Sequence, residues 1–265
     1  MSFVPSFHKS KRITDPPVVV FPHIPKTAGQ TVTKASRCAF PRTAFSPVRT
    51  HAAAPADAQM PPGYQLYAGH IDWVDLETLP ENRFAFTVLR DPRDRIASFY
   101  FYVRREAKKL SRKELASKAR TNMRMAMTRT PDDYFFGGDP AWQRFIQDHY
   151  NNFYCNYFVT RKIRGWKEVA NLDHGSLISR AIIGAGRLQK VYAITDLNLL
   201  EQDLEDVLGV RPKIHGVHLN AGPSPDTARR WTDLIARFER DTSASRLAQF
   251  ADADARLMDR LGLSI

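Results

Sequence analysis

Residues 23–31, HIPKTAGQT, contain the residue types that bind anions and follow the apolar run Val18–Phe21 directly. The pattern predicts a buried strand, a tight loop and a helix that begins near Thr31. Such a unit directs backbone N–H groups and the positive end of a helix dipole at one point, where an anion can bind. Gly29 would let the backbone approach a ligand closely, and Lys26 adds a full positive charge. The stretch therefore predicts a phosphate or sulfuryl site.

A second stretch of the same kind is LRDPRDRIASFYFY, residues 89–102. Arg90 follows a predicted strand, at the carboxyl end where ligands bind in open parallel sheets. Ser98 lies on the helix that follows and offers a hydroxyl. A guanidinium and a hydroxyl together suit a terminal phosphate. A surface ion pair between Arg90 and Asp94 is the alternative interpretation.

The first loop matches neither of the common nucleotide-binding loops. In the Walker A motif the lysine follows the glycine, whereas Lys26 precedes Gly29 and no first glycine is present. The dinucleotide pattern G-x-G-x-x-G is absent too. No H-x-x-x-H pair or acidic cluster with ligand-like spacing predicts a metal site. Taken alone, the loop could be an ordinary strand–helix turn with an exposed lysine.

Composition limits the partners without choosing among them. The net charge of +11 and the pI near 9.8 favour an anionic partner, such as nucleic acid, a phosphate-bearing cofactor, an acidic glycan or a membrane surface. Residues 104–130 hold ten Lys or Arg against two Glu. We interpret this segment either as a track for an acidic acceptor or as a solvated basic helix face.

The chain shows no signal peptide and no window that approaches the roughly 18 apolar residues of a membrane span. Its two cysteines, Cys38 and Cys155, are too few for a disulfide framework or a zinc cluster, so we expect reduced thiols. We therefore expect a soluble, cytoplasmic protein. Its 265 residues fit a flexible N-terminus, 1–15, and one domain, 16–265.

Apolar periodicity predicts strands that alternate with helices, without hairpin signals. This order predicts an α/β fold of the P-loop-like, three-layer type, with a mainly parallel central sheet flanked by helices. Residues 41–63 are rich in Pro and Ala and should be irregular. Asp196 is placed to cap a helix that Gly209 ends. Strands are expected within 18–21, 64–73 (a short strand that runs into a loop at Gly69 and His70), 83–92 (stopped by Asp91 and Pro92) and 188–195. Helices are expected near 31–39, 93–103, 139–161 in part, 196–209, 230–238 and 245–263.

Taken together, these stretches resemble the sulfotransferases that use 3′-phosphoadenosine 5′-phosphosulfate (PAPS), and most closely the Golgi carbohydrate type, which includes heparan sulfate 2-O-sulfotransferase. PKTAGQT resembles the family's 5′-phosphosulfate loop, and RDPRDRIASFY its 3′-phosphate motif, about 60 residues later. YAGHIDW, between them, resembles the segment that carries a catalytic histidine. Gln30 replaces the usual small hydroxyl residue, and we expect no membrane anchor of the kind that the Golgi members carry.

The resemblance implies a metal-free transfer of a sulfuryl group from PAPS to a hydroxyl, on a carbohydrate that could be acidic. Lys26 would stabilise the charge that develops on the bridging oxygen, and His70 would act as the base. Asn220 would belong to a loop, 217–225, that covers the adenine. The implied donor site comprises Lys26, Thr27, Ala28, Gly29, Gln30, Thr31, Arg90, Ser98 and Asn220.

The base and the function class both have alternatives. His70 follows Gly69 at the end of a predicted strand, but it could be a capping or core residue, and His23 ranks second. Further histidine candidates are His51, His149, His215 and His218. A P-loop-like kinase would need a magnesium-binding carboxylate, and a nucleic-acid-binding module would need interleaved aromatic residues or a helix-turn-helix or zinc pattern. A protein that binds PAPS but is inactive is a further alternative. The acceptor and the oligomeric state do not follow from the sequence.

Overall fold

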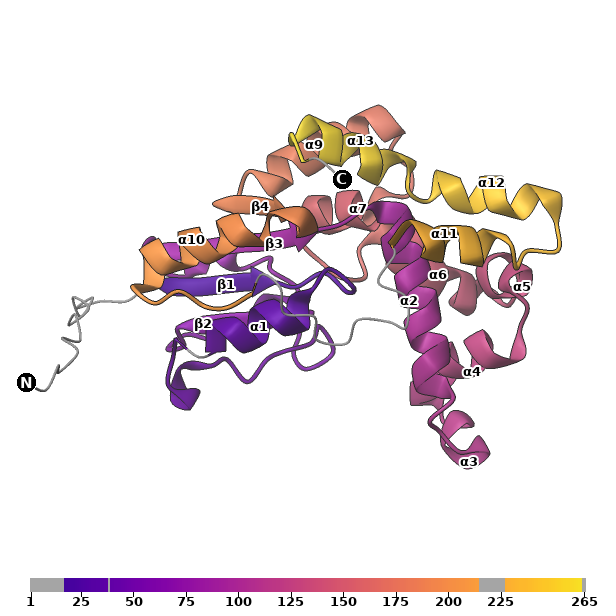
Figure 1. The fold of residues 1–265 in the computed structure, drawn as a ribbon, viewed down its shortest axis with the longest axis horizontal. Coiled ribbons are helices and arrows are strands. Elements are labelled where there is room, and N and C mark those ends of the chain that lie inside the picture. The colour runs from indigo at the N-terminus through magenta and orange to yellow at the C-terminus, as the bar shows by residue number, and fades with distance from the viewer. Residues whose placement is uncertain (1–16, 38, 215–226, 264–265) are drawn as a thin grey trace, which may run out of the picture.

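The fold is built on four parallel strands, as a computed structural model that describes residues 17–37, 39–214 and 227–263 shows (Figure 1). The order in the sheet is β2-β1-β3-β4, so the predicted parallel α/β fold is confirmed. Expectations for Cys38 and residues 1–16 lie outside the described residues. The strands are β1 (Val18–Pro22), β2 (Leu66–Gly69), β3 (Arg83–Leu89) and β4 (Lys190–Ala193).

Both faces of the sheet are covered, which explains why β1, a central strand, is apolar and buried along its whole length. Val18 and Val20 face a core shared with α7 (Phe153–Thr160), α9 (His174–Ala185) and α13 (Asp252–Arg260). Val19 and Phe21 face the opposite core, with α1 (Gly29–Arg37) and α10 (Leu197–Leu208). The three layers therefore follow from the alternation of side chains along each strand.

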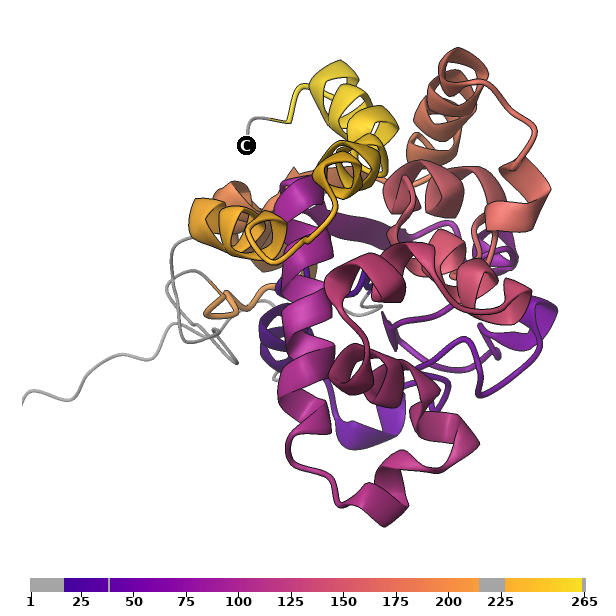
Figure 2. The same ribbon diagram turned by 90° about the vertical axis from the view of Figure 1, so that its right-hand side faces the viewer.

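A helical region extends from one end of the sheet, and α2 (Pro92–Ala107) is its axis. Figure 2 shows α2 between α11 on one side and α4 to α6 on the other. Ile96, Tyr100 and Val103 of α2 are buried in a third core with residues of these helices. The helices are α3 (Arg112–Leu115), α4 (Thr121–Thr128), α5 (Pro131–Phe136), α6 (Pro140–Tyr150), α8 (Trp166–Val169), α11 (Thr227–Ile235) and α12 (Asp241–Gln249).

The ends of α10, α12 and α13 test the predicted helix boundaries. A single helix over 245–263 is wrong, because α12 and α13 are separated at Phe250 and Ala251, where Asn152 donates its N–H to Phe250 O and accepts from Ala253 N–H. Gly209 ends α10 with φ 67°, as predicted. Asp196 precedes α10 without capping it, because a 3₁₀ turn leads into the helix.

Residues 41–63 are irregular, as expected, and extend the edge of the sheet beside β2. Phe45 and Thr50 form isolated parallel bridges with Leu66 and His70. Short 3₁₀ turns occupy Arg42–Ala44, Ala56–Ala58, Leu76–Thr78, Lys118–Arg120 and Ile194–Asp196. Within the described residues, no helix has the length and hydropathy needed to cross a bilayer.

The strand order places a topological switch point between β1 and β3. The chain leaves β1 to form β2 on one side, whereas β3 and β4 lie on the other side. Ligands bind at such points, outside the carboxyl ends of the strands. The loop after β1, residues 23–28, and the turn at Arg90 after β3 both lie here.

Candidate active site

The loop after β1 holds two non-glycine residues in the left-handed region. Lys26 has φ 75° and Ala28 has φ 64°. Such residues cost on the order of 1–3 kcal/mol each and persist where the surroundings impose them. The buried Thr27 donates its hydroxyl to Ile24 O at 2.9 Å and so fixes the turn between them. Strained residues of this kind cluster at functional sites, so this loop is a candidate site.

Gly29 begins α1 against the ring of His23. A Cβ at Gly29 would lie 1.7 Å from His23 Nε2. The His23 ring is only 7% exposed and stacks on Phe21 and on His70, with centroids 5.3 and 4.3 Å away. Gly29 is therefore required by the packing of a histidine, in addition to any role toward a ligand.

Gly29→Ala should lower the free energy of unfolding by about 1–3 kcal/mol, since the new methyl group must displace the His23 ring. Chemical denaturation measures this change. Gly186→Ala is the matched control, because its Cβ would meet only ordinary contacts at 3.5 Å. Equal effects of the two substitutions would contradict this account of Gly29.

Arg90 is a buried arginine that connects the two loops. Its Nη1 donates to Lys26 O at 2.9 Å, and Nη2 forms an ion pair with Asp94. The alternative pairing with Asp94 thus exists, but inside the protein rather than at its surface, since Arg90 is 7% exposed. The Tyr154 hydroxyl donates to Arg90 O and accepts from Arg90 N–H, at 3.0 and 3.4 Å. The backbone at the end of β3 is thereby fixed.

One face of α2 completes the cationic part of the site. Ser98, Tyr102 and Arg105 are spaced four and three residues apart and share that face. Lys26 Nζ lies 4.2 Å from the centroid of the Tyr102 ring. The Ser98 hydroxyl makes no hydrogen bond within the described part of the chain, and its role toward a ligand stays a prediction.

Arg230, on α11, approaches the same place from the far end of the chain. Its Nη1 lies 3.5 Å from Asp94 Oδ1, so Asp94 is shared between Arg90 and Arg230. Sequence reasoning missed Arg230, Tyr102 and Arg105. The helical period that starts at Ser98 could have indicated Tyr102 and Arg105, but no sequence signal indicated Arg230.

The positive charges at this point repel one another. The pKa of Lys26 is lowered to about 8, first by burial and then by the charges of Arg105, Arg90 and Arg230. Among the residues that the structure describes, no carboxylate forms an ion pair with Lys26. An anion bound here would relieve both the repulsion and the desolvation, so the site is suited to a highly charged anion.

His70 lies at the end of β2, beside this cationic group, in a defined tautomer. Its Nδ1 is 2.7 Å from His23 O, and because a carbonyl oxygen only accepts, Nδ1 carries the proton. Burial lowers the pKa of His70, and the charge of Lys26 lowers it further. The ring is therefore neutral near pH 7, with an unprotonated Nε2 that can accept a proton.

The structure brings three other candidate histidines close to His70. His23 stacks on it, and His51 donates its N–H to His70 O at 2.6 Å. Burial and the charge of Arg164 lower the pKa of His51 to about 4 and that of His149 to about 3. His215, His218 and Asn220, with the loop 217–225, lie outside the described residues. Gln30 is exposed and Thr31 buried at the start of α1.

A model of the sulfotransferase family matches residues 10–191 of the 265. The chain belongs to the sulfotransferase family. The match includes Lys26, His70 and Arg90. It covers β1, β2 and β3 completely and ends within β4. No curated protein matches this sulfotransferase significantly.

Family membership makes sulfuryl transfer the general reaction of this sulfotransferase and makes it a transferase. It does not establish the heparan sulfate 2-O subtype. Residues 17–37, 39–214 and 227–263 contain no group of three or more His, Cys, Asp or Glu side chains arranged to hold a metal. Cys155 is a buried free thiol whose pKa burial raises well above its ordinary value.

Proposed function

We propose that this sulfotransferase transfers a sulfuryl group from PAPS to a hydroxyl of a carbohydrate, with His70 as the base. One observation carries the proposal. Lys26, Arg90 and Arg230 converge at the switch point between β1 and β3, beside a neutral His70 with its Nε2 unprotonated. This arrangement offers a strong anion site next to a base.

The residues present fit a donor with two separate anionic groups. When bound, PAPS supplies a sulfur atom joined to a phosphate leaving group. Lys26, at the end of β1, would hold the phosphosulfate and stabilise the charge that develops on the bridging oxygen. Arg90 and Ser98, after β3, would hold the 3′-phosphate. The buried Nε of Arg90 has no partner among the described residues, so the guanidinium has a donor left for a ligand.

His70 would take the proton of the acceptor hydroxyl on Nε2. The imidazolium that forms keeps its Nδ1–H hydrogen bond to His23 O, which stabilises the charged ring. Such a base contributes about 10²- to 10⁴-fold to a rate. The His23 carbonyl would therefore orient the ring that takes the proton.

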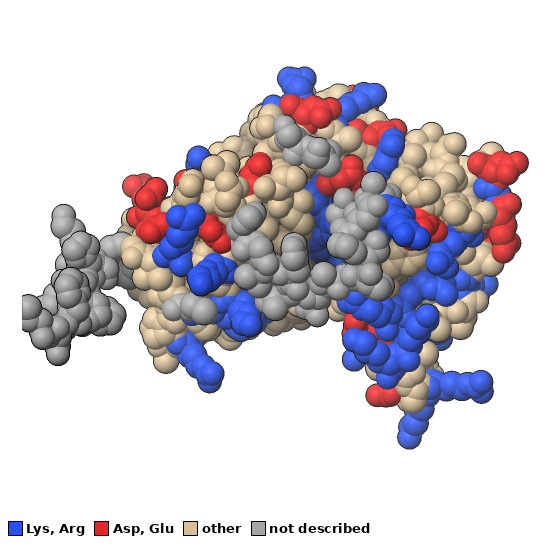
Figure 3. All heavy atoms as spheres, viewed as in Figure 1, with Lys and Arg blue, Asp and Glu red and all other residues tan. Residues whose placement is uncertain are grey.

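An anionic carbohydrate is the acceptor that the surface charge favours. Figure 3 shows Lys and Arg side chains gathered over the region of α2, α3 and α4, which is the basic segment 104–130. That segment forms no continuous basic helix, because α2 ends at Ala107 and α3 and α4 are short. The segment continues directly from the end of α2 that carries Tyr102 and Arg105. A polymer with acidic groups could contact both the basic segment 104–130 and the cationic site around Lys26.

Titration calorimetry with 3′-phosphoadenosine 5′-phosphate tests the donor site. We expect binding without metal, and we expect Arg90→Ala to weaken it by about 10- to 150-fold, since charge-assisted hydrogen bonds contribute about 1.5–3 kcal/mol. Arg112→Ala, an exposed arginine of α3, is the control with the same loss of charge. Binding of ATP with magnesium and indifference to the bisphosphate would contradict the proposal and favour a kinase.

The pH dependence of kcat/KM reports the pKa values of the free enzyme, and it should be bell-shaped because one group must be unprotonated and another protonated. Activity should rise as His70 loses its proton, at a pH below the ordinary 6.5, since burial lowers its pKa. Activity should fall above about pH 8, where Lys26 loses its charge. A profile that stays flat from pH 6 to pH 9.5 would exclude both assignments.

A further inference from the structure

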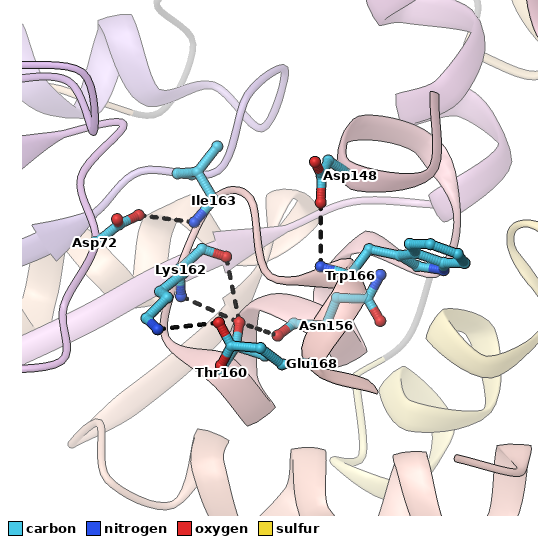
Figure 4. Close-up of polar contacts among 8 residues, drawn as sticks. All are labelled: Asp72, Asp148, Asn156, Thr160, Lys162, Ile163, Trp166 and Glu168. Atoms are coloured by element: carbon cyan, nitrogen blue, oxygen red, sulfur yellow. Dashed lines mark hydrogen bonds and ion pairs between the residues drawn. The ribbon is translucent and has the colours of Figure 1, made fainter. Parts of the chain in front are cut away.

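The connection between α7 and α8, residues 161–165, is held by hydrogen bonds to two aspartates, one at Ile163 and one at Trp166, where α8 begins (Figure 4). Asp72 Oδ1 accepts from Ile163 N–H at 2.7 Å, and Asp148 Oδ1 accepts from Trp166 N–H at 3.1 Å. Asp72 lies two residues after His70, and Asp148 directly precedes His149. Arg164 lies in the sequence between the two attached residues, Ile163 and Trp166.

The connection is also supported from within. Thr160 Oγ1 donates to Asn156 O at 2.7 Å and accepts from Lys162 N–H at 3.2 Å (Figure 4). A Cβ at Gly165 would lie 2.0 Å from Thr160 Oγ1, so only glycine fits there. These contacts fix the backbone on both sides of Arg164, which holds that residue at one place beside the histidines.

Arg164 is an exposed cation on this connection. Its guanidinium forms no ion pair or hydrogen bond with any residue the structure describes. Its charge nevertheless acts to lower the pKa values of Asp72 and Asp148, against the larger effect of burial, which raises them. It is also the largest charge acting on His51 and His149. Lys26, in contrast, acts on His23 and His70. The two cations thus act on different histidines: Lys26 on His23 and His70, and Arg164 on His51 and His149.

His51 and His149, the two histidines on which Arg164 acts, have ring nitrogens without hydrogen-bond partners among the described residues. Both ring nitrogens of His51 and the Nδ1 of His149 are buried and have no partner in the described part of the chain. His149 is itself 7% exposed. Unpartnered polar atoms in such a place are costly unless a ligand or water satisfies them. They suit the hydroxyls of a sugar, which both donate and accept.

We propose that Arg164 binds a carboxylate or sulfate group of the acceptor, beside the hydroxyl that His70 deprotonates, while His51 and His149 contact neighbouring hydroxyls. This inference rests on the proposed function, whose acceptor it specifies as an anionic carbohydrate. A guanidinium fork matches the two oxygens of a carboxylate or sulfate. Arg164 acts on other histidines than Lys26 does, so it offers the acceptor an anion site separate from that of the donor.

The test uses the full chain with 3′-phosphoadenosine 5′-phosphate bound. Calorimetry compares a tetrasaccharide of alternating glucuronate and N-acetylglucosamine, its carboxyl-reduced neutral analogue, and a sulfated, carboxyl-reduced analogue. Arg164→Gln and Arg164→Lys are compared with Lys167→Gln, which removes one exposed charge nearby on α8. Affinity for the bisphosphate alone is measured for every variant.

We expect the wild type to prefer an anionic probe over the neutral one by about 10- to 100-fold. Arg164→Gln should abolish that preference without changing bisphosphate affinity, Arg164→Lys should retain part of it, and Lys167→Gln all of it. The carboxylated and sulfated probes separate the two anionic groups. Full preference in Arg164→Gln, or no preference in the wild type, would overturn this inference alone. Failure of every variant to bind the bisphosphate would overturn the proposed function and this inference with it.

Discussion

Replacement of Lys26 by methionine is expected to lower kcat by about 10²- to 10³-fold, the usual cost of removing one group that stabilises developing charge. Lys26 is the cation at the end of β1, and among the described residues no carboxylate pairs with it, so its charge is available to a reacting anion. Methionine is an unbranched side chain only one atom shorter than lysine, so it removes the charge that lies over the Tyr102 ring with little loss of volume. Steady-state kinetics with saturating donor measures the effect.

The same substitution should leave stability unchanged or increase it, because it removes a buried charge that three arginines repel. The pKa of Lys26 is lower in the folded state than its ordinary value of 10.5, so wild-type stability should gain as pH rises from about 8 to 10.5. Lys26→Met should lack that gain. Lys113→Met, on the exposed α3, is the control. Normal kcat in Lys26→Met would remove this residue from the mechanism.

His70→Ala is expected to lower kcat by about 10²- to 10⁴-fold and to remove the acidic limb of the pH profile. The hydrogen bond from Nδ1 to His23 O leaves Nε2 as the one basic nitrogen of this ring. Pre-steady-state kinetics at several pH values measures both effects. Affinity for the bisphosphate should change less than about 2-fold, since the ring does not carry the donor site's positive charge.

His174→Ala, at the exposed start of α9, controls for the loss of an imidazole. An acidic limb that persists in His70→Ala would assign the proton to another group. His51 and His149 are then the next candidates, since both lie beside His70 with unpartnered ring nitrogens in the described structure. The same kinetics on His51→Ala and His149→Ala would decide between them.

Much of the donor side could be predicted because its signals are local. An apolar strand followed by Lys26 and Gly29, and a second strand followed by Arg90, are patterns within single segments. In a parallel sheet the carboxyl ends of neighbouring strands share one edge, so the two segments had to meet. The observed hydrogen bond from Arg90 to Lys26 O is the direct expression of that rule.

Other predictions missed because distant segments decide them. The ion pair between Arg90 and Asp94, which the alternative interpretation expects at the surface, is buried. Its burial results from the packing of α11 and Tyr154 against this turn. The break between α12 and α13 depends on Asn152, from another helix, and overrides a continuous apolar period. Gly29 was predicted from its freedom toward a ligand, whereas the His23 ring also requires it.

The sequence by itself determined the parallel α/β fold and the two anion-binding segments, because strand periodicity, turn residues and strand-end chemistry are properties of short stretches. Only the tertiary structure decided that Arg230 shares Asp94 with Arg90, that a backbone carbonyl fixes the tautomer of His70, and that Arg164 is held beside the histidines. Each of these depends on contacts between segments far apart in the chain. Their distance and orientation are set by how helices pack on the sheet, which no local pattern encodes.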